Sequence, residues 1–144
     1  MKCLRFLTIA VGLLIFASVA SARVPRYTSD YLKSDPKSHL DKEVKVYIAY
    51  VSPSDYYKKD GYVCFWAKTC YRGDYGGYIY VYVTEEESKD FMRKYGNTSE
   101  YRNGRIQSKS YRGFFMKLEE DCNKYVLVGG GPLVLNKIQT TSAN

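Results

Sequence analysis

The central pattern of this chain is Tyr78-Ile79-Tyr80-Val81-Tyr82-Val83, which Thr84-Glu85-Glu86-Glu87 follows directly. Apolar and tyrosine side chains alternate in the first six residues, so they fall on opposite faces of a strand. The β-branched side chains suit a buried sheet surface. The three phenol rings on the other face can stack, hydrogen-bond or pack against another chain.

A helix is predicted to begin where this strand ends. Thr84 is a suitable N-cap and Glu87 can reach back to it, which makes a capping box. Glutamates fill the first turn, basic residues fill the last, and a glycine follows, as helix ends prefer. Residues 85–95 therefore form the predicted helix. Its inner face is predicted to carry Ser88, Phe91, Met92 and Tyr95.

Residues 1–22 have the features of a secretory signal peptide. Lys2 and Arg5 flank the start of a nearly apolar run, and Ala20-Ser21-Ala22 supplies the small residues of a cleavage site. An uncleaved membrane anchor is the alternative, because the apolar run approaches spanning length. Cleavage after Ala22 predicts a secreted or periplasmic protein. Loss of the leader lowers the formal net charge from +7 to about +5, which allows an anionic partner.

Export also bears on the three remaining cysteines, because exported proteins form disulfides. Cys64 and Cys70 would lie roughly 20 Å apart on an unbroken strand, at about 3.3 Å per residue. A disulfide needs Cα atoms about 4.4–6.8 Å apart. The sequence therefore predicts that Cys122 pairs with either Cys64 or Cys70.

Outside the leader, the chain is predicted to form one domain. Residues 23–39 are polar and contain two prolines, which predicts a flexible N-terminal arm. Residues 40–131 alternate between strand patterns and turn residues, and residues 132–144 are a C-terminal extension. The predicted strands are Val44–Val51, Tyr62–Thr69, Tyr78–Val83, Tyr111–Glu119 and Lys124–Val128.

Alternation also predicts which side chains share a face. In the first strand Val44, Val46, Ile48 and Tyr50 fall together. In the second strand we expect Phe65 inside and Trp66 at least partly outside. In the fourth strand one side carries Phe114, Met116 and Leu118. The segments 72–77 and 97–110 are predicted to be a flexible turn and a mobile basic loop.

Three strands, a helix and two further strands follow one another in the order of the OB-fold, a five-stranded Greek-key barrel. The chain resembles OB-fold modules of small exported bacterial proteins in Leu40-Asp41-Lys42-Glu43-Val44, Phe65-Trp66-Ala67-Lys68-Thr69 and Gly77-Tyr78-Ile79-Tyr80-Val81. The predicted fold is thus mainly β, an OB-fold-like barrel with one α-helix between strands three and four. Phe91, Met92 and Tyr95 would plug the barrel.

This resemblance implies a ligand-binding face on strands two and three. The face and the loop beside it supply aromatic and basic side chains, which are Trp66, Lys68, Tyr78, Tyr80, Tyr82, Tyr56, Tyr57, Lys58 and Lys59. Aromatic rings between cations suit stacking on bases or sugars. The alternatives are a sheet face on which paired aromatic side chains only stabilise the fold, a homodimer contact, or an interface with an envelope protein. Nucleic acid is the less favoured ligand, because an exported protein rarely meets it.

No catalytic or metal-binding pattern is present in the sequence. His39 is the only histidine and lies in the predicted arm, so neither a Ser-His-Asp nor a Cys-His site is readily assembled. The cysteines lack the close pairs of a zinc site. The three glutamates at 85–87 are explained by their place in the first turn of a helix. We therefore expect a non-enzymatic binding protein without a cofactor.

Overall fold

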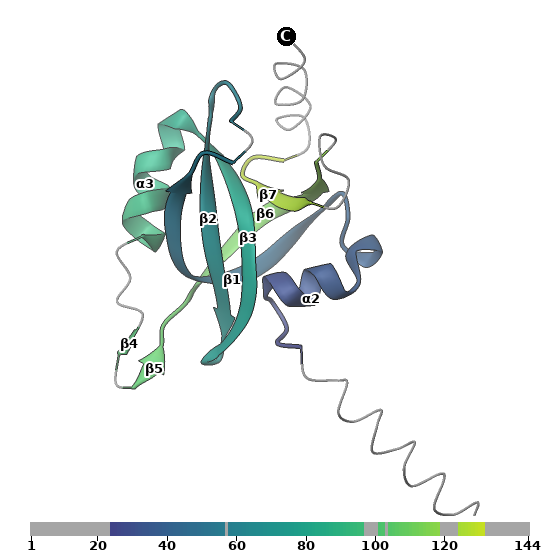
Figure 1. Ribbon diagram of the computed structural model, residues 1–144, viewed down its shortest axis with the longest axis vertical. Helices are drawn as coiled ribbons and strands as arrows, with labels where there is room; N and C mark the ends of the chain where they lie inside the picture. Colours follow the sequence, from purple (N-terminus) through teal and green to yellow (C-terminus); the bar gives the residue numbers. More distant parts are fainter. Residues whose placement is uncertain (1–23, 57, 97–100, 103, 119–123, 132–144) are drawn as a thin grey trace, which may run out of the picture.

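A computed structural model describes residues 24–56, 58–96, 101–102, 104–118 and 124–131. Its main feature is a β-barrel with helices α2 and α3 on opposite sides (Figure 1). The predicted signal peptide and the C-terminal extension lie outside the described residues. Within the described residues, no helix has the length and apolar character needed to cross a membrane.

The barrel contains five strands and the helices lie between or before them. The helical elements are α2 (Ser29–Ser34), a 3₁₀ turn η1 (Pro36–Ser38) and α3 (Glu85–Tyr95). The strands are β1 (Lys42–Ser54), β2 (Tyr62–Tyr71), β3 (Asp74–Thr84), β4 (Tyr101–Arg102), β5 (Arg105–Ile106), β6 (Lys109–Lys117) and β7 (Tyr125–Val128).

The barrel closes in the order β1-β2-β3-β7-β6, with β6 returning to β1. All its neighbouring strands are antiparallel except β3 and β7, which run parallel, with Tyr80 opposite Val126. The α-helix α3 lies between the third and fourth barrel strands in the chain. The prediction of an OB-fold-like, five-stranded barrel with one helix in this position is confirmed.

The helix begins and ends as its sequence predicts. The Thr84 hydroxyl accepts a hydrogen bond from the Glu87 amide at 3.3 Å, and the Gly96 amide donates to the Met92 carbonyl at 2.7 Å. Phe91 and Tyr95 are buried against the barrel interior. The Phe91 ring lies 4.9 Å from the ring of Phe65, which is also buried as predicted.

The first strand is longer than predicted and contains a β-bulge. Its register against β2 shifts between Ile48 and Tyr50. Val46 and Ile48 point into the barrel before the bulge, and Val51 does so after it. The extra residue reverses the alternation, so Tyr50 leaves the face that it was predicted to share with Ile48.

Residues 24–39 are ordered against the barrel, and the prediction of a flexible arm is wrong for them. Leu32 of α2 is buried in the barrel core with 2% of its surface exposed. The Ser29 hydroxyl and the Lys33 ammonium both donate hydrogen bonds to the Tyr78 carbonyl, at 2.5 and 2.9 Å. Because β7 pairs with β3 only around residues 80–82, α2 covers the part of β3 that β7 leaves open.

The glycines before Tyr78 permit this close contact. A Cβ atom at Gly76 would lie 2.2 Å from the Thr28 side chain, and one at Gly77 would lie 2.2 Å from an Asp30 carboxylate oxygen. Gly77 also has φ 75°, which other residues rarely adopt. The pair predicted to be part of a flexible turn is therefore a docking surface for α2.

The turn between β2 and β3 is tighter than predicted. Tyr71 pairs with Asp74, and the two residues between them, Arg72 and Gly73, have φ 52° and 84°. This is a two-residue hairpin turn of type I′. The predicted basic loop after α3 is also partly structured, because β4 and β5 form a small hairpin there.

Phe114 and Met116 share one side of β6, as the sequence predicts, and this side faces away from the barrel core. Phe115 is the residue of this strand that is fully buried in the barrel core. Leu118 and Met116 contribute instead to a second apolar cluster, built around Cys64 and Tyr82. Since Cys64 and Tyr82 stand opposite each other on β2 and β3, this second cluster lies on the outer face of the barrel.

Candidate functional site

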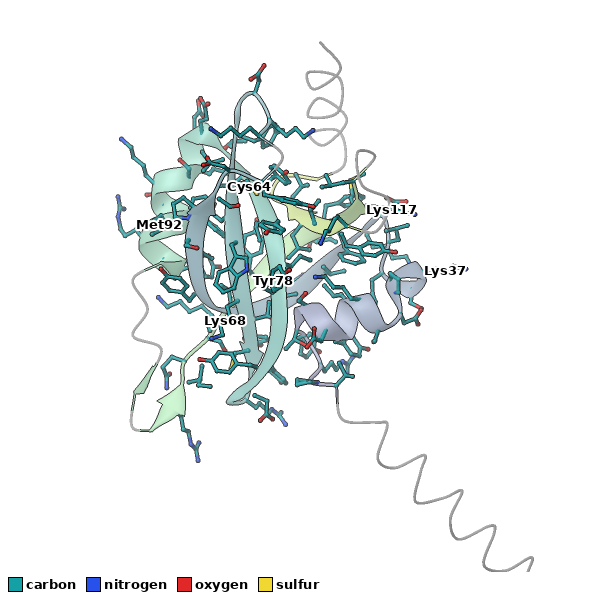
Figure 2. All side chains as sticks on the ribbon, viewed as in Figure 1. Lys37, Cys64, Lys68, Tyr78, Met92 and Lys117 are labelled. Carbon is teal, nitrogen blue, oxygen red and sulfur yellow. The ribbon has the colours of Figure 1, made fainter. Side chains whose placement is uncertain are left out.

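The outer face of β1, β2 and β3 is arranged in three rows of residues that lie opposite one another. The rows are Tyr50–Lys68–Tyr78, Ser52–Trp66–Tyr80 and Ser54–Cys64–Tyr82, called the first, second and third rows below. Directly opposed residues in an antiparallel pair point to the same side of the sheet. Figure 2 shows Lys68, Tyr78 and Cys64 on this side of the barrel.

The first row is the most open part of this face. Tyr78 has 41% of its surface exposed, and its ring lies 5.7 Å from the Trp66 ring at an angle of 31°. The Lys33 ammonium lies 5.0 Å from the centre of the Tyr78 ring, and the Lys68 ammonium lies 3.9 Å from that of Tyr75. Lys33 thus borders the Tyr78 ring, and Lys68, the cross-strand neighbour of Tyr78, borders the Tyr75 ring.

The pKa of Lys33 depends on the groups that surround its ammonium. Desolvation lowers the pKa of Lys33, although Asp30 nearby acts in the opposite direction. Lys33 is nevertheless exposed, and its ammonium donates a hydrogen bond to the Tyr78 carbonyl, which places it at the border of the site. This group comes from α2, so the arm contributes to the site.

The second row is partly covered by the loop after β1. The Tyr56 ring stacks on the Tyr80 ring with centres 4.0 Å apart and an angle of 12°. Tyr78 meets Tyr80 edge to face at 5.9 Å. Burial raises the pKa of the Tyr80 hydroxyl, and Tyr78 adds to this effect. One face of Tyr80 is therefore occupied by Tyr56, whereas the adjacent Trp66 and Tyr78 rings both keep part of their surface exposed.

The third row belongs to the second apolar cluster, and the prediction that Tyr82 contacts a ligand is wrong. Tyr82 has 0% of its surface exposed, and its hydroxyl donates to the Tyr56 carbonyl at 3.3 Å. It packs with Leu118, Val126 and Val128. Alternation places Tyr82 on the outer face correctly, but this part of the face is buried.

The loop predicted to flank the site contributes less than its sequence suggests. Lys59 is buried, with 7% of its surface exposed, and desolvation lowers its pKa. Lys58 is exposed and forms an ion pair with Asp55 at 3.3 Å. Tyr57 lies outside the described residues. Of the four loop residues predicted for the site, Tyr56 is the one shown to contact the aromatic rows.

Cys64 and Cys70 are both free and buried, so the predicted pairing of one of them with Cys122 is not seen. Cys122 itself lies outside the described residues. Burial raises the pKa of the Cys64 thiol to about 12, despite an opposing hydrogen bond with Tyr82. Cys64 thus behaves as a small apolar residue of the second cluster.

Sequence reasoning missed three contributors to this face, namely Lys33, Tyr50 and Ser52. The bulge in β1 brings Tyr50 and Ser52 to the outer side, and strict alternation gives no sign of a bulge. Lys33 reaches the site through the docking of α2. The glycine pair at 76–77 was the available signal, because adjacent glycines in a strand indicate a close approach of another segment.

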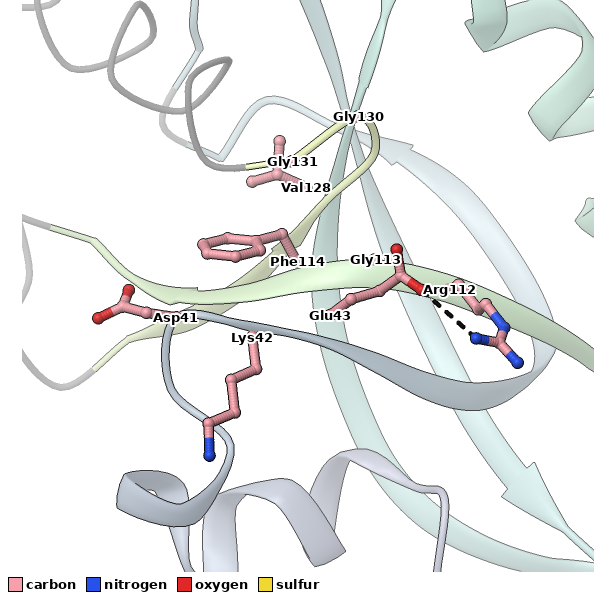
Figure 3. A pocket seen from close by; sticks show the side chains of 9 residues that line it. All are labelled: Asp41, Lys42, Glu43, Arg112, Gly113, Phe114, Val128, Gly130 and Gly131. Atoms are coloured by element: carbon pink, nitrogen blue, oxygen red, sulfur yellow. Dashed lines mark hydrogen bonds and ion pairs between the residues drawn. The ribbon is translucent and has the colours of Figure 1, made fainter.

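A separate hollow of about 570 Å³ lies where β1 and β6 meet the glycines after β7 (Figure 3). Its charged side chains are of both signs, and Glu43 pairs with Arg112 at 3.4 Å. Phe114 lies beside the hollow (Figure 3). Two acidic and two basic residues line this hollow, so its formal charges balance.

The described part of the chain holds no group of three or more His, Cys, Asp or Glu residues that could bind a metal ion. Comparison of the chain with models of known protein families, with curated proteins and with solved structures gave no match. The geometry of the outer face is therefore the main indication of function. That geometry offers stacking and cation contacts, which are suited to binding.

Proposed function

We propose that this protein is an exported, non-enzymatic binding module that binds an acidic oligosaccharide on the first and second rows. The observation that carries this proposal is the pair of tilted rings, Trp66 and Tyr78, 5.7 Å apart, with Lys33 beside the Tyr78 ring and Lys68 opposite Tyr78 on β2. Adjacent rings suit the apolar faces of sugars, and the ammonium groups suit their carboxylate or sulfate substituents. OB-fold-like barrels bind oligosaccharides on this face.

The size of the exposed surface favours a narrow ligand over a protein partner. Val24 and Tyr78 are the exposed large hydrophobic residues of the described chain. A stable protein interface buries on the order of 800 Å² on each side and has an apolar centre. The inward stacking of Tyr56 on Tyr80 and the burial of Tyr82 remove two of the rings that such a centre would need. A chain-like ligand needs only the rings that remain.

The proposal is tested by calorimetric titration of the protein with acidic and neutral oligosaccharides of equal length. Trp66→Ala and Tyr78→Ala should each weaken binding about 3- to 10-fold, because each removes one stacking surface. Tyr78→Phe is the matched control, since it keeps the ring and should retain binding. Equal affinity of the wild type and the two alanine variants would show that the ligand binds elsewhere.

Light scattering at low salt and at about 0.5 M salt tests the competing function. A dimer that resists salt and is lost in Tyr78→Ala would identify the face as a protein interface instead. Tight binding of single-stranded oligonucleotides, with an affinity that falls steeply as salt rises, would identify a nucleic-acid site. The proposed oligosaccharide site predicts a monomer with modest salt dependence, because only two cations border the rings.

A further inference from the structure

A second candidate site lies away from the aromatic rows, between the β2–β3 turn and the segment that begins at β5. Here the surface has a hollow of about 670 Å³. Its lining residues are Arg72, Gly73, Arg105, Ile106, Gln107 and Ser108. Two of these are arginines, contributed by hairpins that are far apart in the sequence. None of them is acidic or aromatic.

Arg72 occupies an unusual backbone position. Its φ of 52° places it at the first central position of a type I′ turn, where asparagine, aspartate and glycine are favoured because a Cβ atom is crowded there. An arginine at this position carries a conformational cost that asparagine would avoid. Arg72 thus places a guanidinium group at the edge of the hollow despite an unfavourable backbone conformation. Strained backbone conformations of this kind often occur at functional sites.

Arg72 and Arg105 are both exposed. Among the described residues, no ion pair involves Arg72 or Arg105. Arg72 lies over the ring of Tyr71, 5.2 Å from its centre, which restricts the side chain without neutralising its charge. Gln107 donates to the Arg105 carbonyl at 3.3 Å and so helps to shape the segment that carries Arg105. The one acidic residue adjoining the turn, Asp74, is exposed and does not line the hollow.

We propose that this hollow binds a sulfate or phosphate group carried by a glycan. Planar guanidinium groups donate paired hydrogen bonds to tetrahedral oxyanions, and two arginines on separate hairpins can hold one such group between them. Ser108 adds a hydroxyl to the lining. A sulfated or phosphorylated glycan can bind through its anionic group alone, whereas binding of single-stranded nucleic acid commonly adds base stacking, for which the lining offers no ring. This site shares no residue with the aromatic rows, so the inference stands independently of the oligosaccharide proposal.

The test follows amide signals by NMR while the protein is titrated with sodium sulfate or sodium phosphate at constant ionic strength. The signals of Gly73, Ile106 and Ser108 should shift saturably with either oxyanion and not with chloride. Arg72→Asn should weaken this binding about 3- to 10-fold, allowing for solvent screening of an exposed charge. Because asparagine suits the turn, thermal stability should stay the same or rise, which separates loss of binding from misfolding.

Arg105→Gln should weaken binding to a similar extent, whereas Arg93→Gln should leave it unchanged. Arg93 is the matched control because it is exposed on α3 and already pairs with Asp90 at 3.0 Å. A sulfated hexasaccharide that displaces sulfate from the same amides would support the glycan assignment. Absence of saturable shifts, equal affinity in the variant lacking both Arg72 and Arg105, or tighter competition by an oligonucleotide would each overturn the proposal.

Discussion

Cys64 and Tyr82 in the third row of the outer face are buried. The first row, about 13 Å further along the same strands at about 3.3 Å per residue, is open to solvent. Tyr82 and Tyr78 are the same residue type on the same side of β3, yet 0% of one and 41% of the other is exposed. The difference arises from what covers them. Leu118 and β7 lie over Tyr82, whereas β7 does not extend to Tyr78.

This contrast shows that one tyrosine-rich strand has two roles. At the end near α3 its outer face extends the hydrophobic core, and at the end near the β2–β3 turn it forms a surface with cations beside it. The row between them has an intermediate character, because Tyr80 packs against the second cluster and also contacts Tyr78. Substitutions near Tyr82 should therefore mainly lower stability, and substitutions near Tyr78 should mainly weaken binding.

The largest effect is expected for Tyr82→Ala. Removal of this fully buried ring should lower the free energy of unfolding by about 3–5 kcal/mol, as for other buried aromatic residues. Chemical denaturation measures the change, with Phe91→Ala at the α3 interface as a reference of similar size. A loss below about 1 kcal/mol would mean that the third row is as open as the first.

Leu32→Ala tests whether the open end of the face depends on α2. Leu32 is buried in the barrel core, so its truncation should lower the free energy of unfolding by about 2–4 kcal/mol. Amide exchange at Tyr78 and its neighbours should accelerate, because α2 covers this part of β3. Val24→Ala, at an exposed position of the same segment, is the control. Unchanged stability and exchange would indicate that α2 is not docked in solution.

Tyr80→Ala should have an intermediate effect, about 1–2 kcal/mol, because it removes a stacked pair with Tyr56 while leaving the core intact. The domain should stay folded. Global unfolding in this variant would show that the second row belongs fully to the core.

The buried thiol of Cys64 predicts a dependence of stability on pH. Its pKa rises from 9.0 in a free thiol to about 12 in the fold, so the unfolded chain loses its proton first as pH rises. The folded state therefore keeps its full stability with respect to Cys64 below pH 9. Between about pH 9 and pH 12 the free energy of unfolding declines, by about 1 kcal/mol at pH 10. The measurement is denaturation of the wild type and Cys64→Ala across this range. A pH slope that is the same in both proteins would contradict the assignment of Cys64 to the second cluster.

Tyr78→Ala should have the smallest effect on stability, below about 0.5 kcal/mol, because its side chain is largely outside the core. Ligand binding should weaken in this variant while Tyr82→Phe retains it. If Tyr78→Ala instead destabilises the domain as strongly as Tyr82→Ala, the first row is part of the packing and the proposed site is lost.

The sequence by itself determined the five barrel strands, the helix α3 and the inner face of β3. Alternation over residues 78–83 placed Ile79, Val81 and Val83 inside, and the capping residues set the limits of α3, because both signals depend on neighbours within a few positions. From the order of these elements the OB-fold-like barrel follows.

Only the tertiary structure decided which outer residues are covered. The burial of Tyr82, the bulge that turns Tyr50 outward and the docking of Lys33 beside Tyr78 each depend on contacts between distant segments. Likewise, Arg72 and Arg105 come together because two hairpins fold to the same end of the barrel. A local pattern fixes the side to which a side chain points, but whether water or protein lies there depends on the packing of the whole chain.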